Sequence, residues 1–154
     1  MCQIIEVEGT INQEKFTPHV IEPSYGIDRI FYCILEHSFY ETEKNTETYR
    51  ILRLKPSIAP IKTGVLPLIN DEKLISIAKK IDRTLRENGI QTYYDNSGSI
   101  GRRYARMDEI GTPFCITIDY DTIDDNSVTV RDRDTTKQER IPIYKIVEYI
   151  SNRI

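Results

Sequence analysis

Cysteine and histidine are scarce in this chain, and their positions argue against a metal site. The 154 residues include three cysteines, Cys2, Cys33 and Cys115, and two histidines, His19 and His37. No two cysteines form a CxxC pair, and the histidines lie in no zinc-type spacing. An odd number of widely spaced cysteines favours reduced thiols. We therefore expect no metal and a cytoplasmic location, with a mitochondrial form as the alternative.

The sequence also lacks a long apolar run and an excess of positive charge. No stretch is apolar for long enough to span a membrane. The formal net charge is −3, so the chain as a whole does not attract nucleic acid, and any such binding requires a local basic patch. We expect neither a membrane nor DNA as a partner. The length suggests one folded domain, or one domain with a fragment of a second.

The first 54 residues predict a strand–helix–strand unit. Residues 3–8 alternate weakly, and residues 17–23 form an extended apolar run bounded by prolines. A helix follows, with an apolar face at i, i+3, i+4, i+7 and i+8. The polar run at 41–48 is typical of a solvated loop, and residues 49–54 alternate as a second strand. We expect the helix face to be covered by the rest of the chain or by another copy. Its members are Ile27, Ile30, Phe31, Ile34 and Leu35.

From residue 55 onward, a repeating pattern predicts a mixed β-sheet flanked by helices, an α/β fold. Strands are expected at 57–66, 89–95 and 114–120, and a hairpin at 127–133 and 137–143. A helix is expected at about 71–88, beginning with Asn70 or Asp71 as a cap and ending at Gly89. A second, shorter helix follows Gly98, and a third begins at Pro142. The boundary between residues 1–54 and the domain at 55–154 is placed near residues 54–56.

Segment 95–111, DNSGSIGRRYARMDEIG, predicts an anion-binding turn. Gly98 and Gly101 allow a tight turn at a helix N-terminus, where free N–H groups favour a phosphate. Three arginines follow; the first and third share one helix face, and the second points about a quarter turn away. Nearby tyrosines at 93, 94 and 104 suit stacking on bases. The alternative is a tight turn whose arginines pair with the acidic residues at 108–109. The arginines are Arg102, Arg103 and Arg106.

Segment 130–134, VRDRD, offers a second basic feature. In a strand, Arg131 and Arg133 face the same side, roughly 7 Å apart. Two planar guanidinium groups at that spacing suit phosphates or base edges. The alternative is a solvated edge strand whose charges prevent aggregation. The local sequence does not separate the two interpretations.

A third feature lies where the apolar run meets the first helix. Glu22 stands two residues before Ser24, so its carboxylate suits an ammonium group beside a hydroxyl. Arg29, one turn into the helix, suits stacking on a base or neutralising a phosphate. The alternative is an exposed helix start in which Ser24 caps the helix and Arg29 is solvated.

In this order, the three segments resemble glycyl-tRNA synthetase of the eukaryotic and archaeal type, a class II family. PHVIEPSYGIDR resembles the third signature motif of its catalytic domain. SGSIGRRYARMDEIGTPFCITIDYDT and TVRDRD resemble its anticodon-binding domain. The resemblance implies that Glu22 holds the glycine ammonium, that Ser24 lines the same pocket and that Arg29 binds ATP. It also implies ATP with Mg as cofactors and a homodimeric parent enzyme.

The same resemblance implies that the domain from residue 57 binds the anticodon stem-loop of a glycine tRNA. The contacts it implies are Arg131 and Arg133, on an expected sheet edge, and the arginines after Gly101. The first two class II motifs are absent from this sequence, so we expect the chain alone to bind tRNA without activating glycine. The alternative is a non-catalytic, synthetase-like module that binds a partner protein.

Overall fold

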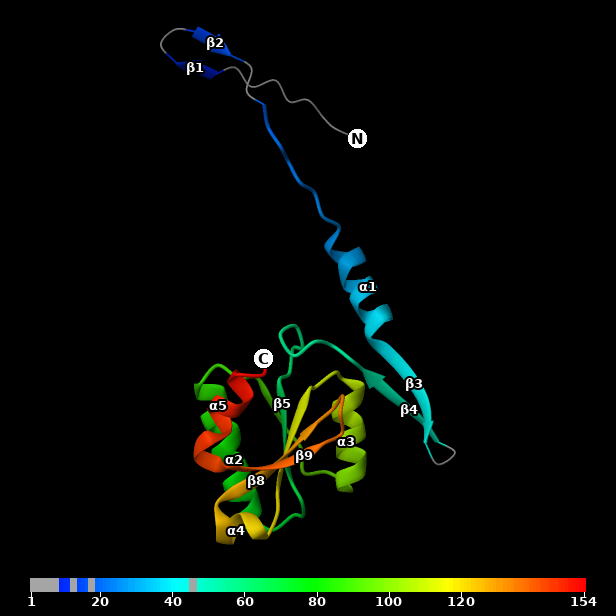
Figure 1. Cartoon of the computed structure of the whole chain (residues 1–154), viewed down its shortest axis with the longest axis vertical. Helices are drawn as coiled ribbons and strands as arrows, with labels where there is room; N and C mark the ends of the chain where they lie inside the picture. The colour runs from blue at the N-terminus through cyan, green and yellow to red at the C-terminus, as the bar shows by residue number, and fades with distance from the viewer. Residues whose placement is uncertain (1–8, 12–13, 17–18, 45–46) are drawn as a thin grey trace.

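A five-stranded mixed sheet forms the centre of the computed structural model, which describes residues 9–11, 14–16, 19–44 and 47–154. The strand order is β6-β5-β7-β8-β9 (Figure 1). β5 pairs in parallel with β6 and β7, whereas β7–β8 and β8–β9 pairings are antiparallel. This confirms the mixed sheet. The strands are β5 (Thr63–Pro67), β6 (Thr92–Tyr94), β7 (Phe114–Ile118), β8 (Ser127–Asp132) and β9 (Gln138–Pro142).

Two helices cover one face of the sheet, α2 (Glu72–Glu87) and α5 (Ile146–Ser151). Asp71 caps α2 by accepting a hydrogen bond from the backbone N–H of Lys73 at 2.9 Å. The apolar stripe of α2 packs on β5 and β7 in one core, where each fully buried aliphatic side chain contributes about 1.5–3 kcal/mol. Residues of this core from helices and strands are Leu74, Ala78, Ile81, Leu85, Val65, Ile116, Ile118, Ile146 and Ile150.

The opposite face carries α3 (Ile100–Glu109) and a smaller apolar cluster. Met107 packs there against Leu66 and Cys115. Gly64 makes this approach close, because a Cβ at that position would lie 3.0 Å from the Met107 side chain. Two short elements were not expected from the sequence: α4 (Asp121–Asp125) and the 3-10 turn η1 (Ile143–Lys145), which precedes α5.

The N-terminal part forms an arm that projects from the sheet domain (Figure 1). It comprises α1 (Ile27–Ser38), then β3 (Phe39–Lys44) and β4 (Glu47–Leu52), which pair as an antiparallel hairpin. Farther out, β1 (Gly9–Ile11) pairs with β2 (Glu14–Phe16). β4 packs against α3, and the backbone N–H of Arg53 bonds to the carbonyl of Ser38 at 2.6 Å. The end of α1 is therefore tied to the hairpin.

Three expectations for the arm need correction. The expected loop at 41–48 is wrong, because residues on both sides of its centre belong to the β3–β4 hairpin. Of the expected strand at 17–23, residues 19–23 form none, and the weak strand at 3–8 lies outside the described residues. The α1 face is not covered by the sheet domain, since no α1 residue is buried. Cover by another copy, and the boundary at 54–56, stay predictions.

Candidate nucleic-acid interface

Three loops meet at the carboxyl ends of the parallel strands, the edge where open α/β sheets usually bind ligands. They follow β5, β6 and β7 at residues 68–71, 95–99 and 119–120. Leu68 and Ile69 are exposed in the first loop, and Tyr120 is 53% exposed in the third. α3 begins directly after the second loop, with its first turn at Ile100. Exposed apolar, aromatic and backbone N–H groups are thus gathered at one edge.

Arg103 holds two of these loops together from inside. Its side chain enters the protein, and the residue is 2% exposed. The guanidinium donates to the carbonyls of Pro67, of Leu68 at 3.0 Å and of Asp95 at 3.3 Å. Burial lowers the pKa of Arg103. Because its donors bind carbonyls at the ends of β5 and β6, Arg103 fixes the shape of the edge and does not reach solvent.

Arg106 and Arg102 lie on the outer side of α3, as the i, i+4 spacing predicts. Arg106 Nη2 lies 2.6 Å from the Asp95 carboxylate and also donates to the carbonyl of Ser97. Asp95 in turn accepts from the backbone N–H and hydroxyl of Ser97, both at 2.9 Å. Arg106 therefore orders the 95–99 loop, while Arg102 is exposed.

Arg131, on β8, and Arg133, directly after β8, do not lie on a sheet edge. β9 pairs with β8 over residues 138–142, so β8 is an internal strand, and the expectation of an edge is wrong. Arg131 forms a two-pronged ion pair with Asp108 at 3.0 Å, and Arg133 is 3% exposed. Arg133 donates to the carbonyls of residues 52, 54 and 111. Arg131 and Arg133 thus serve internal contacts.

The tyrosines, like the arginines, differ in their exposure to solvent. Tyr93, on the outer strand β6, is 45% exposed and presents a ring to solvent. Tyr104 is half-buried, and its hydroxyl lies 2.5 Å from that of Thr117. Tyr94 packs against the main core. Sequence reasoning missed Tyr120; its position directly after the buried strand β7 was the available signal.

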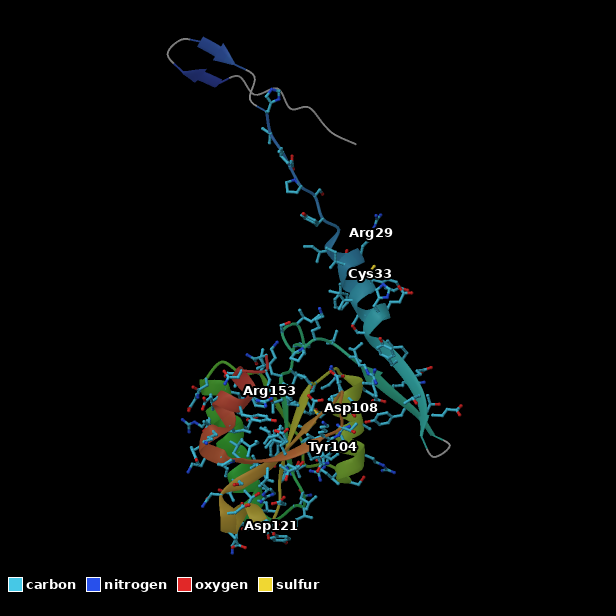
Figure 2. All side chains as sticks on the ribbon, in the orientation of Figure 1. Arg29, Cys33, Tyr104, Asp108, Asp121 and Arg153 are labelled. Carbon is cyan, nitrogen blue, oxygen red and sulfur yellow. The ribbon has the colours of Figure 1, made fainter. Side chains whose placement is uncertain are left out.

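Negative charge surrounds Tyr120 and limits where a phosphate backbone can run. Asp121 lies on α4, at the end of the sheet domain farthest from α1 (Figure 2). Arg140 donates to Asp119 at 2.7 Å and to Asp125 at 2.9 and 3.0 Å, so its charge is already compensated. Hydrogen bonds to these two carboxylates raise the pKa of Arg140. The α3 side of the edge, with Arg102, is the side that favours phosphates.

The N-terminal candidates lie far from this edge. Glu22 and Ser24 are exposed in the extended segment before α1. Arg29 lies on the first turn of α1, near Cys33 (Figure 2). Both residues line an open groove of about 750 Å³, which Arg53 also lines. Neither Glu22 nor Ser24 lines that groove. Within the described ranges, no cluster of three or more His, Cys, Asp or Glu side chains could hold a metal ion. No described helix is long and apolar enough to cross a bilayer.

Comparison with known proteins adds independent information. Residues 57–153 match the family model of the anticodon binding domain. Glycine–tRNA ligase of Methanocaldococcus jannaschii is 56% identical over 152 residues, which is 99% of this chain and 26% of that protein. The enzyme of the same name from Archaeoglobus fulgidus is 55% identical over 129 residues, which is 84% of this chain and 23% of that protein. The chain therefore spans about a quarter of the length of these relatives.

A solved structure agrees on the fold. A chain of prolyl-tRNA synthetase from Cryptosporidium parvum, complexed with L-proline and AMP, superposes with a TM-score of 0.62. The match covers 66% of this chain and 22% of that chain at 23% sequence identity. At this identity the likeness concerns the fold alone.

Proposed function

The chain belongs to the family of anticodon-binding domains, and from that premise we propose that it binds the anticodon stem-loop of a glycine tRNA as part of a glycine–tRNA ligase. The identity of more than half with archaeal glycine–tRNA ligases supports the choice of amino acid. The single structural observation that carries RNA binding is the edge shaped by Arg103. Exposed Arg102 lies on the first turn of α3, and the exposed rings of Tyr93 and Tyr120 lie on or directly after strands that end at this edge.

We propose that the unpaired anticodon bases lie along this edge. Tyr93 and Tyr120 offer rings for stacking, which contributes about 1–3 kcal/mol per base. Arg102 and the free N–H groups of the α3 N-terminus would take phosphates. Arg106 orders the loop at 95–99 through its ion pair with Asp95. Of the five arginines that the sequence suggested, Arg102 and Arg106 remain in the proposed interface.

In the full ligase, we propose that Glu22 and Ser24 bind glycine and that Arg29 contacts ATP. A carboxylate suits the glycine ammonium, and an arginine at a helix start suits the nucleotide. ATP and Mg would be supplied to the parent enzyme, which we propose is a cytoplasmic homodimer. This chain spans about a quarter of the length of the glycine–tRNA ligases that it matches, and we propose that it does not activate glycine by itself.

The test is binding of a labelled glycine-tRNA anticodon stem-loop, measured by fluorescence anisotropy at several salt concentrations. Each phosphate contact adds about 0.7–0.9 to the log–log salt slope. Arg102→Met should weaken binding and reduce that slope by about one contact. Arg83→Met is the matched control, because Arg83 is exposed on α2, across the sheet. Binding that ignores changes to the anticodon cytosines would count against the proposal.

A second candidate function is supported by the exposed apolar side chains of the arm. Ile21 is 94% exposed and Phe31 is 62% exposed, and such a surface is typical of a protein contact. A non-catalytic module that binds a partner protein would use it. Capture of a protein partner, with no affinity for any tRNA, would favour this candidate over the ligase.

A further inference from the structure

A buried polar network joins the arm to the sheet domain. Asp108, near the end of α3, is fully buried and accepts hydrogen bonds from two other elements. Tyr49, on β4, donates its hydroxyl proton to one carboxylate oxygen. Arg131, on β8, donates Nη1 to Oδ1 and Nη2 to Oδ2, both at 3.0 Å. The Arg131 guanidinium also lies 4.9 Å from the centre of the Tyr104 ring. One carboxylate thus links three elements.

Arg133, two residues farther along the chain, makes a second connection between the same parts. It donates to the carbonyl of Leu52 at 3.0 Å and to that of Leu54 at 2.8 Å, both in the segment that ends the arm. It also donates to Gly111, just after α3, at 2.8 Å. Arg133 and the Tyr49–Asp108 hydrogen bond therefore both hold the end of the hairpin against the sheet domain. This leaves the hairpin little freedom to swing about residues 52–54.

The geometry of this network suits it to hold the arm at a fixed angle to the sheet domain. The two-pronged Arg131–Asp108 pair lies within the sheet domain and fixes the position and plane of the carboxylate, which then accepts the hydrogen bond from Tyr49 of the arm. Buried pairs of this kind add less stability than well-packed apolar side chains would, so their geometric role is the more informative one. The same short helix, α3, carries Asp108 on its buried side and Arg102 on its exposed side. Movement of the arm is therefore coupled to the helix that we assign to RNA.

We propose that Asp108, through Tyr49 and Arg131, is a positioning residue that fixes the arm bearing Arg29 at one angle to the anticodon-binding edge. This inference rests on the proposed function. In the ligase it would set the distance between the site that reads the anticodon and the site that charges the tRNA. Asp108 touches neither glycine nor ATP, so it acts on the reaction through geometry alone. Figure 2 shows Asp108 between the sheet domain and the arm, with Arg29 and Cys33 on the arm beyond it.

The first experiment measures the angle between the arm and the sheet domain in this chain. Spin labels on exposed Cys33 and on an introduced Lys79→Cys in α2 report the arm-to-domain distance by pulsed electron paramagnetic resonance, in a Cys2→Ser background. We expect Asp108→Asn to broaden the distance distribution at least two-fold. Tyr49→Phe removes one hydrogen bond and no charge, so it should broaden the distribution less and keeps the test valid if Asp108→Asn does not fold.

The control is Asp124→Asn, which neutralises an exposed carboxylate on α4 and should leave the distribution unchanged. An unchanged width in both Asp108→Asn and Tyr49→Phe would overturn the proposal. This first experiment needs no RNA. It therefore stays decisive even if the wild-type chain fails to bind the stem-loop, a result that would refute the proposed function alone.

The second experiment uses the full-length ligase and distinguishes a positioning role of Asp108 from a general loss of folded structure. We expect Asp108→Asn to lower kcat/KM for tRNA charging at least ten-fold. Glycine-dependent ATP–pyrophosphate exchange, which needs no tRNA, should stay within two-fold of wild type. Equal losses in both reactions would indicate damage to the fold and overturn the positioning role. Full charging activity in a variant with a broadened distance distribution would overturn it as well.

Discussion

Replacing Arg133 with methionine should destabilise the chain strongly, because this guanidinium serves three backbone carbonyls at once. Methionine keeps most of the side chain's length and apolar stem but supplies no donor. The carbonyls of Leu54 and Gly111 are buried, and that of Leu52 is half-buried, so none is readily compensated by water. A buried acceptor that loses its partner costs about 1–3 kcal/mol.

We take about 1 kcal/mol for each carbonyl, at the low end because the structure can relax. The ion pair with Asp134 adds little, since that carboxylate is 47% exposed. The expected loss for Arg133→Met is therefore about 3–4 kcal/mol, close to the 3–5 kcal/mol typical of breaking a buried charged contact. Arg133→Lys keeps the charge but concentrates its donors on one nitrogen, so it should lose about half as much.

Urea unfolding followed by circular dichroism measures this loss. With a slope near 2 kcal/mol per molar urea, Arg133→Met should lower the midpoint by roughly 1.5–2 M. Arg102→Met is the matched control: the same substitution at an exposed arginine on α3 should change stability by less than about 0.5 kcal/mol. A loss below about 1 kcal/mol in Arg133→Met would refute the reasoning that these carbonyls depend on Arg133.

Three further outcomes are expected. Gly111→Ala should destabilise by about 1–3 kcal/mol in urea unfolding, because Gly111 has a φ of +84° and a Cβ there would lie 2.9 Å from a buried leucine. Burial opposes ionisation of Asp119, but hydrogen bonds from Arg140 and Thr122 outweigh it and lower its pKa; the stability that this gives is present above pH 4 and is lost as pH falls through the folded pKa. The difference in melting temperature between wild type and Asp119→Asn should therefore shrink as the pH is lowered below 4. Burial raises the pKa of Cys115 to about 12, so in a background without the cysteine at position 2, a thiol reagent at pH 8 should label Cys33 and leave Cys115 unmodified until the chain unfolds.

The sheet domain was largely predictable because its elements carry strong local signals. The helix at 72–87 has a 3.6-residue apolar period, a cap at Asp71 and a stop at Gly89. Each of these signals is local in sequence, so it can be identified without knowing the tertiary structure. The β8–β9 hairpin was visible from its alternation. In contrast, residues 41–48 at the outer end of the β3–β4 hairpin are all polar, so nothing in them distinguished strands from a loop. α4 is five residues long, too short to show a period.

The basic residues were less predictable, because the exposure of an arginine depends on partners remote in sequence. The Arg131 side chain is only 11% exposed because it pairs with Asp108, 23 positions away, which also accepts a hydrogen bond from Tyr49, 82 positions away. A strand pattern predicts which side of the sheet an arginine faces, but it does not predict which residues the arginine contacts on that side. For Arg103, by contrast, helical spacing correctly separated it from Arg102 and Arg106, although its carbonyl partners could not be foreseen.

Arg133 serves stability and Arg102 serves the proposed recognition of RNA, so the two roles are experimentally distinguishable. Typical domains are stable by about 5–15 kcal/mol, so a loss of 3–4 kcal/mol leaves Arg133→Met mostly folded at room temperature. That variant should then bind the stem-loop nearly as wild type does, since Arg133 points away from the proposed edge. Arg102→Met should do the reverse, with full stability and weakened binding. If both variants instead lost binding together, RNA would have to contact the arm side of the domain as well, and the interface would extend beyond the carboxyl edge of the sheet.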